Sequence, residues 1–323
     1  MEKKVALIFN PVAGKGHAEK YLPVIRKQFE SLGIIYELFQ TERVGHAQEI
    51  AQQNCDKFPV IAVAGGDGTC NEAINGIMAY RKTSGGKCPD FAVIPVGRGN
   101  DFSYGAGVPK DIGEACRIIA DNTTRALDVG RITGGFYPEG KYFANGIGIG
   151  FDTVVGLNAA KHTNLHGAMS YLAGVVDTFK VFNNSPKSTI SYNGKTEEYE
   201  FTQISILNGR RMGGLFYMAP ESDISDGKLD LCMTVQALTR LQMIRLLFKY
   251  FRGSQIYSPL MKTARSFSYE ITAPHGGLVC HADGETVCTD GTHLFIECVP
   301  SALRIFTKPG LPSPLAVTAK ADA

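Results

Sequence analysis

The 323-residue chain contains no tryptophan, no C-x-x-C pair and no long apolar run. Because its eight cysteines are scattered, the usual zinc spacings are absent, and a disulfide scaffold is not expected. No apolar stretch approaches the roughly 20 residues of a membrane-spanning helix. The first apolar run ends at Asn10-Pro11, too early for a signal-peptide core. These absences favour a cytoplasmic protein with reduced thiols.

Excess charge of either sign is also lacking. The 33 Lys and Arg nearly balance the 31 Asp and Glu, which leaves a formal net charge of +2. A general nucleic-acid binder needs a clustered basic excess, so we expect no nucleic-acid partner. The length exceeds the range in which one hydrophobic core keeps growing, which predicts two domains.

The first third of the chain alternates short apolar runs with helical patterns. The runs read as strands buried on both faces, and apolar residues recur at helical spacing between them. This pattern predicts an α/β domain with a mostly parallel sheet over residues 1–125. The strand candidates are Val5–Phe9, Val60–Ala64 and Phe91–Val96.

Residues 126–306 have a different texture and predict an antiparallel β-rich domain. Asn193-Gly194 is a strong two-residue hairpin signal. Helical patterns interrupt the strands near Ala168–Phe182 and Thr239–Gln255. The Pro-containing segment 307–323 is expected to be a disordered tail. Further strand candidates are Thr189–Tyr192, Thr202–Leu207, Leu229–Val235, Ser268–Thr272, Leu278–His281 and Leu294–Val299.

The strongest local motif is Gly65-Gly66-Asp67-Gly68-Thr69, between a predicted strand and a predicted helix. Glycines let the backbone approach a phosphate closely, and the following helix N-terminus attracts anions. Asp67 fits such a site if Mg²⁺ lies between carboxylate and phosphate, or if it accepts a proton. The alternative is a plain strand-to-helix turn in which Asp67 caps the helix.

Two further turns follow neighbouring strands, at Asn10–Gly16 and at Pro95–Asp101. Ligands of open α/β sheets gather outside the carboxyl ends of the strands, so these loops predict one shared crevice. Gly14-Lys15-Gly16 is not a Walker A loop, because the upstream Gly and the following Ser or Thr are absent. Each turn alone could be purely structural.

Together these motifs resemble the diacylglycerol kinase family, which includes bacterial lipid kinases and is similar to sphingosine and ceramide kinases. The resemblance implies an NAD-kinase-like N-terminal domain, a C-terminal β-rich domain and an active site between them. It implies ATP and Mg²⁺ as cofactors. The motifs in order are Asn10-Pro11 to Gly14, Gly65–Thr69 with Asn71-Glu72, Pro95-x-Gly97-x-Gly99-Asn100-Asp101, Asn145–Asp152, Asp226–Asp230 and Asp283-Gly284-Glu285.

The resemblance also assigns candidate site residues. Arg98 departs from the family, which usually has Thr there, and would place a permanent charge near the phosphates. The nucleotide-binding candidates are Asn10, Pro11, Gly14, Thr41, Gly65, Gly66, Gly68, Thr69, Asn71, Glu72, Gly97, Arg98, Asn100 and Asp101.

The catalytic candidates are Asp67, Glu285 and Asp283. By itself, Asp283-Gly284 favours a hairpin turn followed by a solvated Glu285. By the resemblance, Glu285 is the general base for a lipid hydroxyl, Asp283 is its neighbour and Asp67 serves the metal and phosphate; which of Asp67 and Glu285 accepts the proton stays open.

A third acidic loop runs from Asp223 to Lys228. It lacks the ligand spacing of an EF-hand, and its plain interpretation is a turn before a strand. By the resemblance it is a structural Mg²⁺ site. The Asp226 carboxylate and the backbone oxygens of Asp223 and Lys228 would bind the ion.

The resemblance predicts ATP-dependent phosphorylation of a lipid hydroxyl, with diacylglycerol as acceptor and phosphatidic acid as product. Sphingoid bases and undecaprenol remain open as acceptors. An NAD kinase and a catalytically silent nucleotide-binding regulator are the alternatives. We expect the protein to visit the membrane surface during turnover, and a homodimer is plausible. The helix pattern at Thr239–Gln255 is either a surface helix packed on the core or a contact to lipid headgroups.

Overall fold

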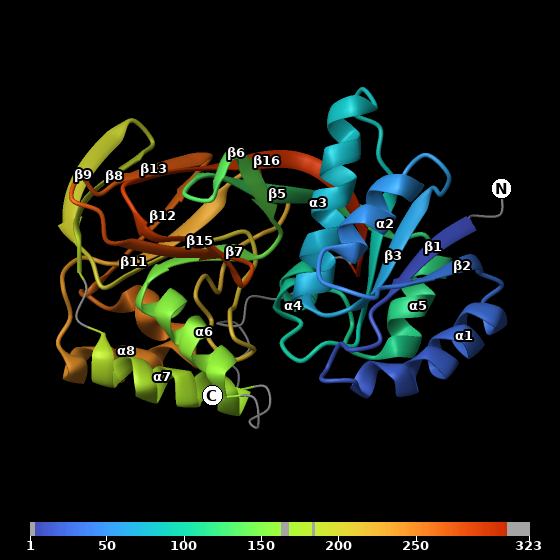
Figure 1. Cartoon of the computed structure of the whole chain (residues 1–323), viewed down its shortest axis with the longest axis horizontal. Coiled ribbons are helices and arrows are strands. Elements are labelled where there is room, and N and C mark those ends of the chain that lie inside the picture. The colour runs from blue at the N-terminus through green and yellow to red at the C-terminus, as the bar shows by residue number, and fades with distance from the viewer. Residues whose placement is uncertain (1–3, 163–167, 183–184, 309–323) are drawn as a thin grey trace.

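A computed structural model describes residues 4–162, 168–182 and 185–308. Four parallel strands open the chain, in the spatial order β2-β1-β3-β4 (Figure 1). The three strands expected from apolar runs are confirmed. The half-exposed edge strand β2 was not expected, because it has no continuous apolar run. The bounds are β1 Lys4–Phe9, β2 Ile35–Gln40, β3 Val60–Gly65 and β4 Asp90–Pro95.

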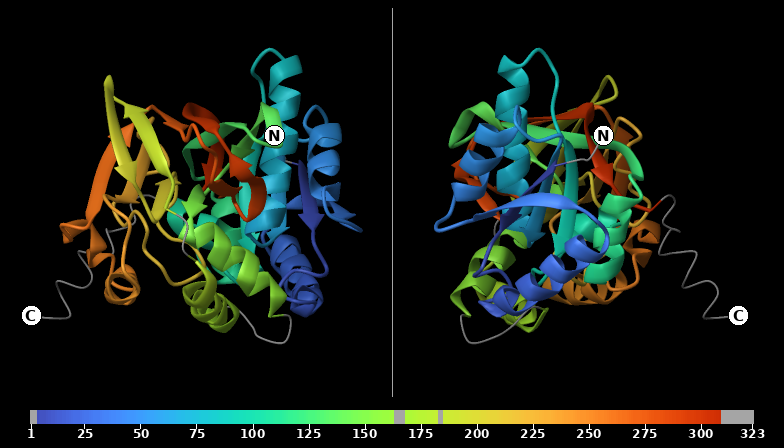
Figure 2. Two further views of the ribbon diagram at one scale, coloured as in Figure 1. Left: turned by 60° about the vertical axis from the view of Figure 1, so that its left-hand side comes forward. Right: turned by 90° about the vertical axis from the view of Figure 1, so that its right-hand side faces the viewer.

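Helices cover both faces of this parallel sheet. Alternate strand residues point to opposite faces, so Ile61 and Val63 pack towards α2 and α3, while Ala62 and Ala64 pack towards α1 and α5. Figure 2 shows α1 and α5 side by side on their face. The helices are α1 Leu22–Ser31, α2 His46–Asn54, α3 Asp67–Thr83, α4 Asp101–Ala106 and α5 Ile112–Ala120, with a short 3₁₀ turn η1 at His17–Tyr21.

The second half of the chain forms two packed sheets. One is a six-stranded antiparallel sheet in the order β12-β11-β10-β7-β14-β15. The other extends the N-terminal sheet to ten strands, and a common core lies between the two. The strands are β5 Thr124–Gly134, β6 Tyr137–Phe143, β7 Gly146–Gly150, β8 Lys187–Tyr192, β9 Lys195–Glu200, β10 Gln203–Leu207, β11 Leu229–Thr234, β12 Met261–Ser266, β13 Ser268–Thr272, β14 Leu278–Ala282, β15 Glu285–Gly291 and β16 His293–Phe306.

The antiparallel β-rich half is therefore confirmed. Asn193 and Gly194 both have positive φ, 49° and 73°, as expected for the predicted tight hairpin between β8 and β9. Three helices lie along one edge of this half (Figures 1 and 2). They are α6 Phe151–Lys161, α7 Ala168–Val181 and α8 Arg240–Tyr250, followed by a 3₁₀ turn η2 at Ser254–Tyr257.

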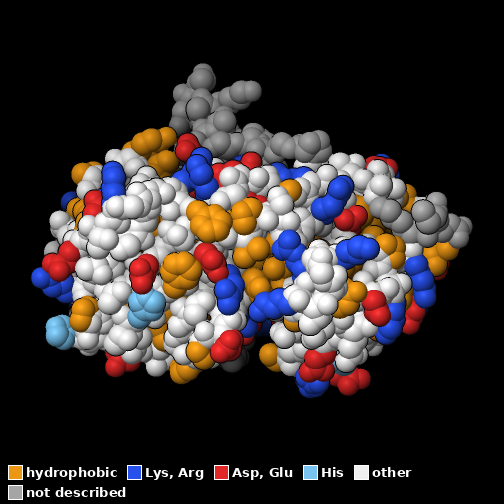
Figure 3. All heavy atoms as spheres, turned by 90° about the horizontal axis from the view of Figure 1, so that it is seen from above, with side chains coloured by type: hydrophobic (Ala, Val, Ile, Leu, Met, Phe, Trp, Pro, Cys, Tyr) orange, Lys and Arg blue, Asp and Glu red, His pale blue; other side chains and the backbone are white. Residues whose placement is uncertain are grey.

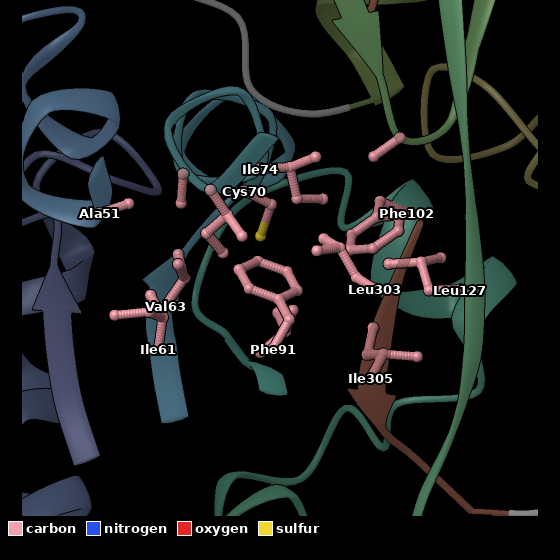
Figure 4. Packing of buried hydrophobic residues seen from close by; sticks show 14 of the residues in the cluster. Ala51, Ile61, Val63, Cys70, Ile74, Phe91, Phe102, Leu127, Leu303 and Ile305 are labelled. Atoms are coloured by element: carbon pink, nitrogen blue, oxygen red, sulfur yellow. The ribbon is translucent and has the colours of Figure 1, made fainter. Parts of the chain in front are cut away.

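One strand connects the two halves. β16 pairs with β13 and β5, and its end pairs with β4 of the parallel sheet through Ile305 and Phe91. Figure 4 shows Leu303 and Ile305 from β16 packed beside Phe91, near Leu127 of β5 and Phe102 of α4. The two halves thus share a sheet and a core, and the division at residue 125 stays a prediction.

Two expected boundaries need correction. The helix expected over Thr239–Gln255 ends at Tyr250, because Gly253 adopts a left-handed conformation with φ of 69° after it. The expected tail 307–323 lies outside the described residues from 309 onwards. Thr307 is buried and donates to the Ala106 carbonyl, and Lys308 pairs with Glu114, so the packed structure extends to residue 308.

All eight cysteines are free thiols, and seven of them are buried. Within the described ranges, no helix combines the length and hydrophobicity that a bilayer crossing requires.

Gly76 fixes the packing of α3, the helix that begins at Asp67. A Cβ at residue 76 would lie 2.2 Å from the Gln48 carbonyl oxygen of α2. We expect Gly76→Ala to destabilise the protein by about 1–3 kcal/mol, because overpacking outweighs the gain in helix propensity. Thermal and urea unfolding measure this change.

Gly156→Ala in α6 is the matched control, since nothing lies within 4 Å of its added Cβ. Its stability should stay equal or rise slightly. Equal unfolding midpoints for the two variants would contradict the proposed helix contact.

Candidate active site

Three turns meet at the carboxyl ends of β1, β3 and β4. The Gly65 carbonyl accepts the N–H groups of Val96 and Gly97, so the turns after β3 and β4 lie against each other. A Cβ on Gly97 would lie 2.3 Å from the Gly66 Cα, which only glycine avoids. At Gly66 and Gly97 the backbones of the two turns therefore lie directly against each other with no side chain between them.

The turn after β1 is tied to the same place. The Asn10 side chain donates to Thr69 Oγ1 at 2.9 Å, and its oxygen accepts the Val12 N–H at 3.1 Å. Gly14 has φ of 62°, and a Cβ there would lie 3.1 Å from the Val96 carbonyl oxygen. The three loops expected to share one crevice therefore do so.

A cleft of about 730 Å³ opens above these turns and reaches the second half of the chain. Ten of the candidate residues line it. The second half contributes Gly156, Ala159, His162, Ser170, Gly213 and Gly214. The candidates in the lining are Asn10, Gly14, Gly66, Asp67, Gly68, Thr69, Glu72, Gly97, Arg98 and Asp101.

Other candidates support the cleft from behind or lie beside it. Thr41 is buried and donates its N–H to the Phe9 carbonyl at the end of β1. Asn100 adopts φ of 51° and donates from its side chain to the Gly97 carbonyl. The candidates outside the cleft lining are Pro11, Thr41, Gly65, Asn71, Asn100, Asp283 and Glu285.

Two carboxylates stand close together in the cleft. Asp67 Oδ1 accepts the Phe102 N–H at 2.9 Å, and burial raises the pKa of Asp67. Burial, and then the negative charge of Asp67, raise the pKa of Asp101 to about 7. A cation between like charges relieves their repulsion, so this pair suits Mg²⁺ carried by nucleotide phosphates.

Arg211 joins Asp101 to the second half of the chain. Its Nε donates to Asp101 Oδ1 at 2.7 Å, and its Nη2 donates to the Gly99 carbonyl at 3.1 Å. The guanidinium lies 3.9 Å from the centre of the Tyr104 ring. The Gly214 N–H also donates to Asp101. The loop after β4 is thus held from the opposite side of the cleft.

Glu285 lies near α3, one helical turn beyond Asp67. The fully buried Asn71 amide lies 3.4 Å from Glu285 Oε1, and Lys141 Nζ lies 2.7 Å from Glu285 Oε2. Asp67 and Asn71 are four residues apart in one helix, a rise of about 6 Å. The structure therefore brings the two proposed catalytic carboxylates to the same helix from opposite halves of the chain.

Asp283 is bound to the backbone. Its carboxylate accepts the N–H groups of Ala144, Asn145 and Gly146 at 2.6–3.2 Å, where β7 begins. Burial raises the pKa of Asp283 to about 6. In its alternative orientation, the Asn71 amide donates to Asp283 Oδ2 at 3.3 Å. Asp283 is therefore placed to hold the turn that presents Glu285.

The acidic loop Asp223–Lys228 lies away from the cleft lining. Asp223 pairs with Arg125, and Asp226 accepts the Lys228 N–H at 3.0 Å. Asp128, fully buried, accepts N–H groups from Gly227 and Ser301. Across the described ranges, no three His, Cys, Asp or Glu side chains gather as a metal-binding group. The Mg²⁺ role of Asp223, Asp226 and Lys228 stays a prediction.

Arg211 and Lys141 were not among the sequence candidates. Arg211 is 110 residues from Asp101, and Lys141 is 144 residues from Glu285. Arg211 lies in the glycine-rich segment Asn208–Gly214, a local signal that was not among the recognised motifs, whereas Lys141 lies in no such motif.

An apolar cavity adjoins the cleft across α6. Phe151, Asp152 and Val155 of this helix face the cavity, whereas Gly156 and Ala159 face the cleft. Asp152 is buried, accepts the Ser205 hydroxyl at 2.9 Å, and has a pKa raised by burial to about 7. Much of the remaining lining comes from Leu238 and from aliphatic and aromatic side chains of α7 and α8, namely Val175, Phe179, Met243, Leu246, Leu247 and Tyr250.

Comparison with known proteins agrees with this geometry. Residues 4–132 match the diacylglycerol kinase catalytic domain family, and residues 145–307 match the YegS C-terminal NAD kinase beta sandwich-like domain family. A diacylglycerol kinase of Bacillus subtilis is 28% identical over 257 residues, which cover 79% of this chain and 80% of that protein.

Solved structures show the same fold. A diacylglycerol kinase from Bacillus anthracis superposes with a TM-score of 0.71 at 24% identity, covering 95% of this chain and 97% of that chain. Yeast NADH kinase superposes with a TM-score of 0.52 at 9% identity, covering 95% and 83%. The expected NAD-kinase-like architecture is therefore confirmed. With both halves matched, the chain belongs to the diacylglycerol kinase family of ATP-dependent lipid kinases.

Proposed function

We propose that this protein transfers the γ-phosphoryl group of ATP to the hydroxyl of diacylglycerol and releases phosphatidic acid and ADP. The observation that carries the proposal is the pairing of two chambers across α6. One is a polar cleft lined by glycine-rich turns and carboxylates, and the other is apolar. A nucleotide needs the first kind of site, and an acyl-bearing alcohol needs the second.

The cleft supports triphosphate binding without a Walker A loop. Backbone groups of the turns at Gly14, Gly66 and Gly97 face it, and α3 begins at its edge with its positive dipole end. Arg98 is exposed and lines the same space, so its permanent charge supports a contact to phosphate. Asp67 would hold Mg²⁺, which on binding neutralises charge on the transferred phosphoryl group.

The transfer itself needs a proton acceptor for the alcohol. The hydroxyl oxygen bonds to the γ-phosphorus as the bond to the β–γ bridging oxygen breaks, and ADP leaves. We assign the hydroxyl proton to Glu285, which stands one helical turn from Asp67 and is oriented by Lys141 and Asn71. Asp283 positions the Glu285 turn through its bonds to the β7 backbone.

The apolar cavity supports a lipid acceptor over NAD. Most of its lining side chains are aliphatic or aromatic, which suits an acyl chain better than a dinucleotide. At about 50 Å³ the cavity is narrow, so an acyl chain would enter only as α7 and α8 move apart.

Phosphate transfer to a panel of alcohols tests the proposal. With radiolabelled ATP and Mg²⁺, we expect label in diacylglycerol in mixed micelles, and little in sphingosine, undecaprenol or NAD. A higher rate on another lipid would identify that lipid as the acceptor, and the protein would still be a lipid kinase. Label in NAD alone would overturn the lipid assignment, and tight ATP binding without any transfer would indicate a silent regulator.

Asp67→Asn should abolish most turnover while the fold stays intact. Removing the charge that serves Mg²⁺ and the phosphates should lower kcat by roughly 10²–10³-fold or more, as for other groups that stabilise transition-state charge. Initial rates and thermal unfolding measure the two effects. The exposed Asp56→Asn is the control for a lost surface carboxylate, and its rate should not change. Equal rates for both variants would refute the role of Asp67.

Glu285→Gln should lower kcat by about 10²–10⁴-fold, the usual range for a general base. The KM for ATP should stay nearly constant, because Glu285 lies outside the cleft lining. Glu198→Gln, which removes the carboxylate of an exposed Lys–Glu pair with Lys187 on β8–β9, should leave both constants unchanged. A parallel loss of kcat and of ATP affinity would indicate a structural role for Glu285.

A further inference from the structure

Helix α8 carries two apolar stripes, not one. Met243 is buried against α6 and α7, and Leu246 and Tyr250 are buried against the six-stranded sheet. Leu241, Ile244 and Phe248 recur on the opposite side and are 57%, 41% and 65% exposed. The first stripe therefore accounts for the packing of α8 on the rest of the protein. Packing does not explain why the second, exposed stripe is apolar.

Helix α7 continues this exposed apolar surface. Met169 and Val176, seven residues apart and hence on one side of α7, are 59% and 56% exposed. The two helices pack together through Val175, Met243 and the partly buried Leu247. Figure 1 and the left view of Figure 2 show α7 and α8 along the same lower edge. We name the outward side of these helices the α7–α8 face, comprising Met169, Val176, Leu241, Ile244 and Phe248.

The charged residues of α8 are all basic. Helix α8 has no Asp or Glu, and its exposed basic residues are Arg240, Arg245 and Lys249, followed by Arg252. On α7 the single acidic residue, Asp177, is paired with Lys180 and His162. On the opposite side of the molecule, Figure 3 shows basic and acidic side chains interspersed. Basic residues beside exposed apolar side chains suit an anionic lipid surface.

We propose that the α7–α8 face docks on an anionic phospholipid bilayer. Phe248 and its apolar neighbours enter the interface, and Arg245, Lys249 and Arg252 meet the headgroups. This inference rests on the proposed function, because α7 and α8 also wall the apolar cavity. Docking by these helices would bring the cavity to the bilayer, where a long-chain diacylglycerol resides.

Vesicle sedimentation tests the α7–α8 face with the full chain. The probes are vesicles of phosphatidylcholine alone and of phosphatidylcholine mixed with phosphatidylglycerol. We expect binding to the mixed vesicles, and Phe248→Ser should lower the partition coefficient roughly tenfold or more, the worth of one buried aromatic side chain. Arg245→Gln and Lys249→Gln should each lower it roughly fivefold and reduce its salt dependence.

Phe136→Ser is the matched control. Phe136 is 64% exposed, almost equal to Phe248, but lies between β5 and β6 on the other side of the molecule (Figure 1). Its loss should leave vesicle binding unchanged. Equal binding of wild type, Phe248→Ser and Phe136→Ser would overturn the proposal. The proposal would also be overturned if Phe248→Ser changed a dimer into a monomer while vesicle binding stayed the same. The α7–α8 face would then bind a second copy of the chain.

Two assays separate this inference from the proposed function. Phe248 lies outside both the cleft and cavity linings, so Phe248→Ser should keep its turnover on a water-soluble, short-chain diacylglycerol. Its turnover on long-chain diacylglycerol in mixed vesicles should fall with the partition coefficient. If wild type phosphorylates no diacylglycerol, the sedimentation result still decides the docking surface. If Phe248→Ser lowers the turnover of both substrates equally, Phe248 affects the active site itself and the docking role is refuted.

Discussion

The return of strand β16 to the parallel sheet is the constraint on which the rest of the structure depends. This strand has 14 residues, roughly 45 Å, and pairs along its length with β13, β5 and finally β4. A cleft between two separate domains would depend on a linker for its width. Here β16 carries one sheet from the second half of the chain into the first, and Figure 4 shows Leu303 of this strand packed in the core near Phe91. The backbone hydrogen bonds of β16 therefore join the two halves of the chain directly.

A second contact acts at the mouth of that cleft. Arg211 and the Gly214 N–H hold Asp101, and Asp101 follows directly on the glycine turn that faces the nucleotide site. Burying a carboxylate is costly unless it is paired, so the loop and Arg211 stabilise each other only in this arrangement. Burial, and then the negative charge of Asp67, raise the pKa of Asp101, and the Arg211 guanidinium opposes that rise. The contact of Arg211 with Asp101 therefore both connects the two halves of the chain and shapes the electrostatics of the site.

Sequence predicted those parts whose cause is local. Continuous apolar runs gave the strands β1, β3 and β4, and the crowding of Gly66 against Gly97 is the physical reason for the glycine motifs. The strand β7, with the sequence GIGIG, was missed because such a run reads as a turn. It is a buried strand between β10 and β14, and glycine is needed at residue 148 because a Cβ there would lie 2.5 Å from the Asp152 carboxylate.

Long-range partners were beyond a reading of the sequence. The position of Lys141 beside Glu285 depends on the pairing of β5 with β6 and on the turn between β14 and β15. The amphipathic pattern at Thr239–Gln255 was visible in the sequence. Its division into a buried and an exposed stripe was not, because helical periodicity alone does not show which side of a helix the rest of the protein covers.

Helix α6 separates two environments that the substrates of a lipid kinase, ATP and a lipid alcohol, require. A triphosphate needs polar backbone groups, cations and water at its entrance, whereas an acyl chain needs a dry, apolar wall. Residues one helical position apart, Val155 and Gly156, face the cavity and the cleft respectively. The small side of the helix admits a ligand close to its backbone, and the bulky side packs against α7 and α8. One helix therefore borders both chambers, and under the proposed function the lipid would lie on its apolar side and the nucleotide on its polar side.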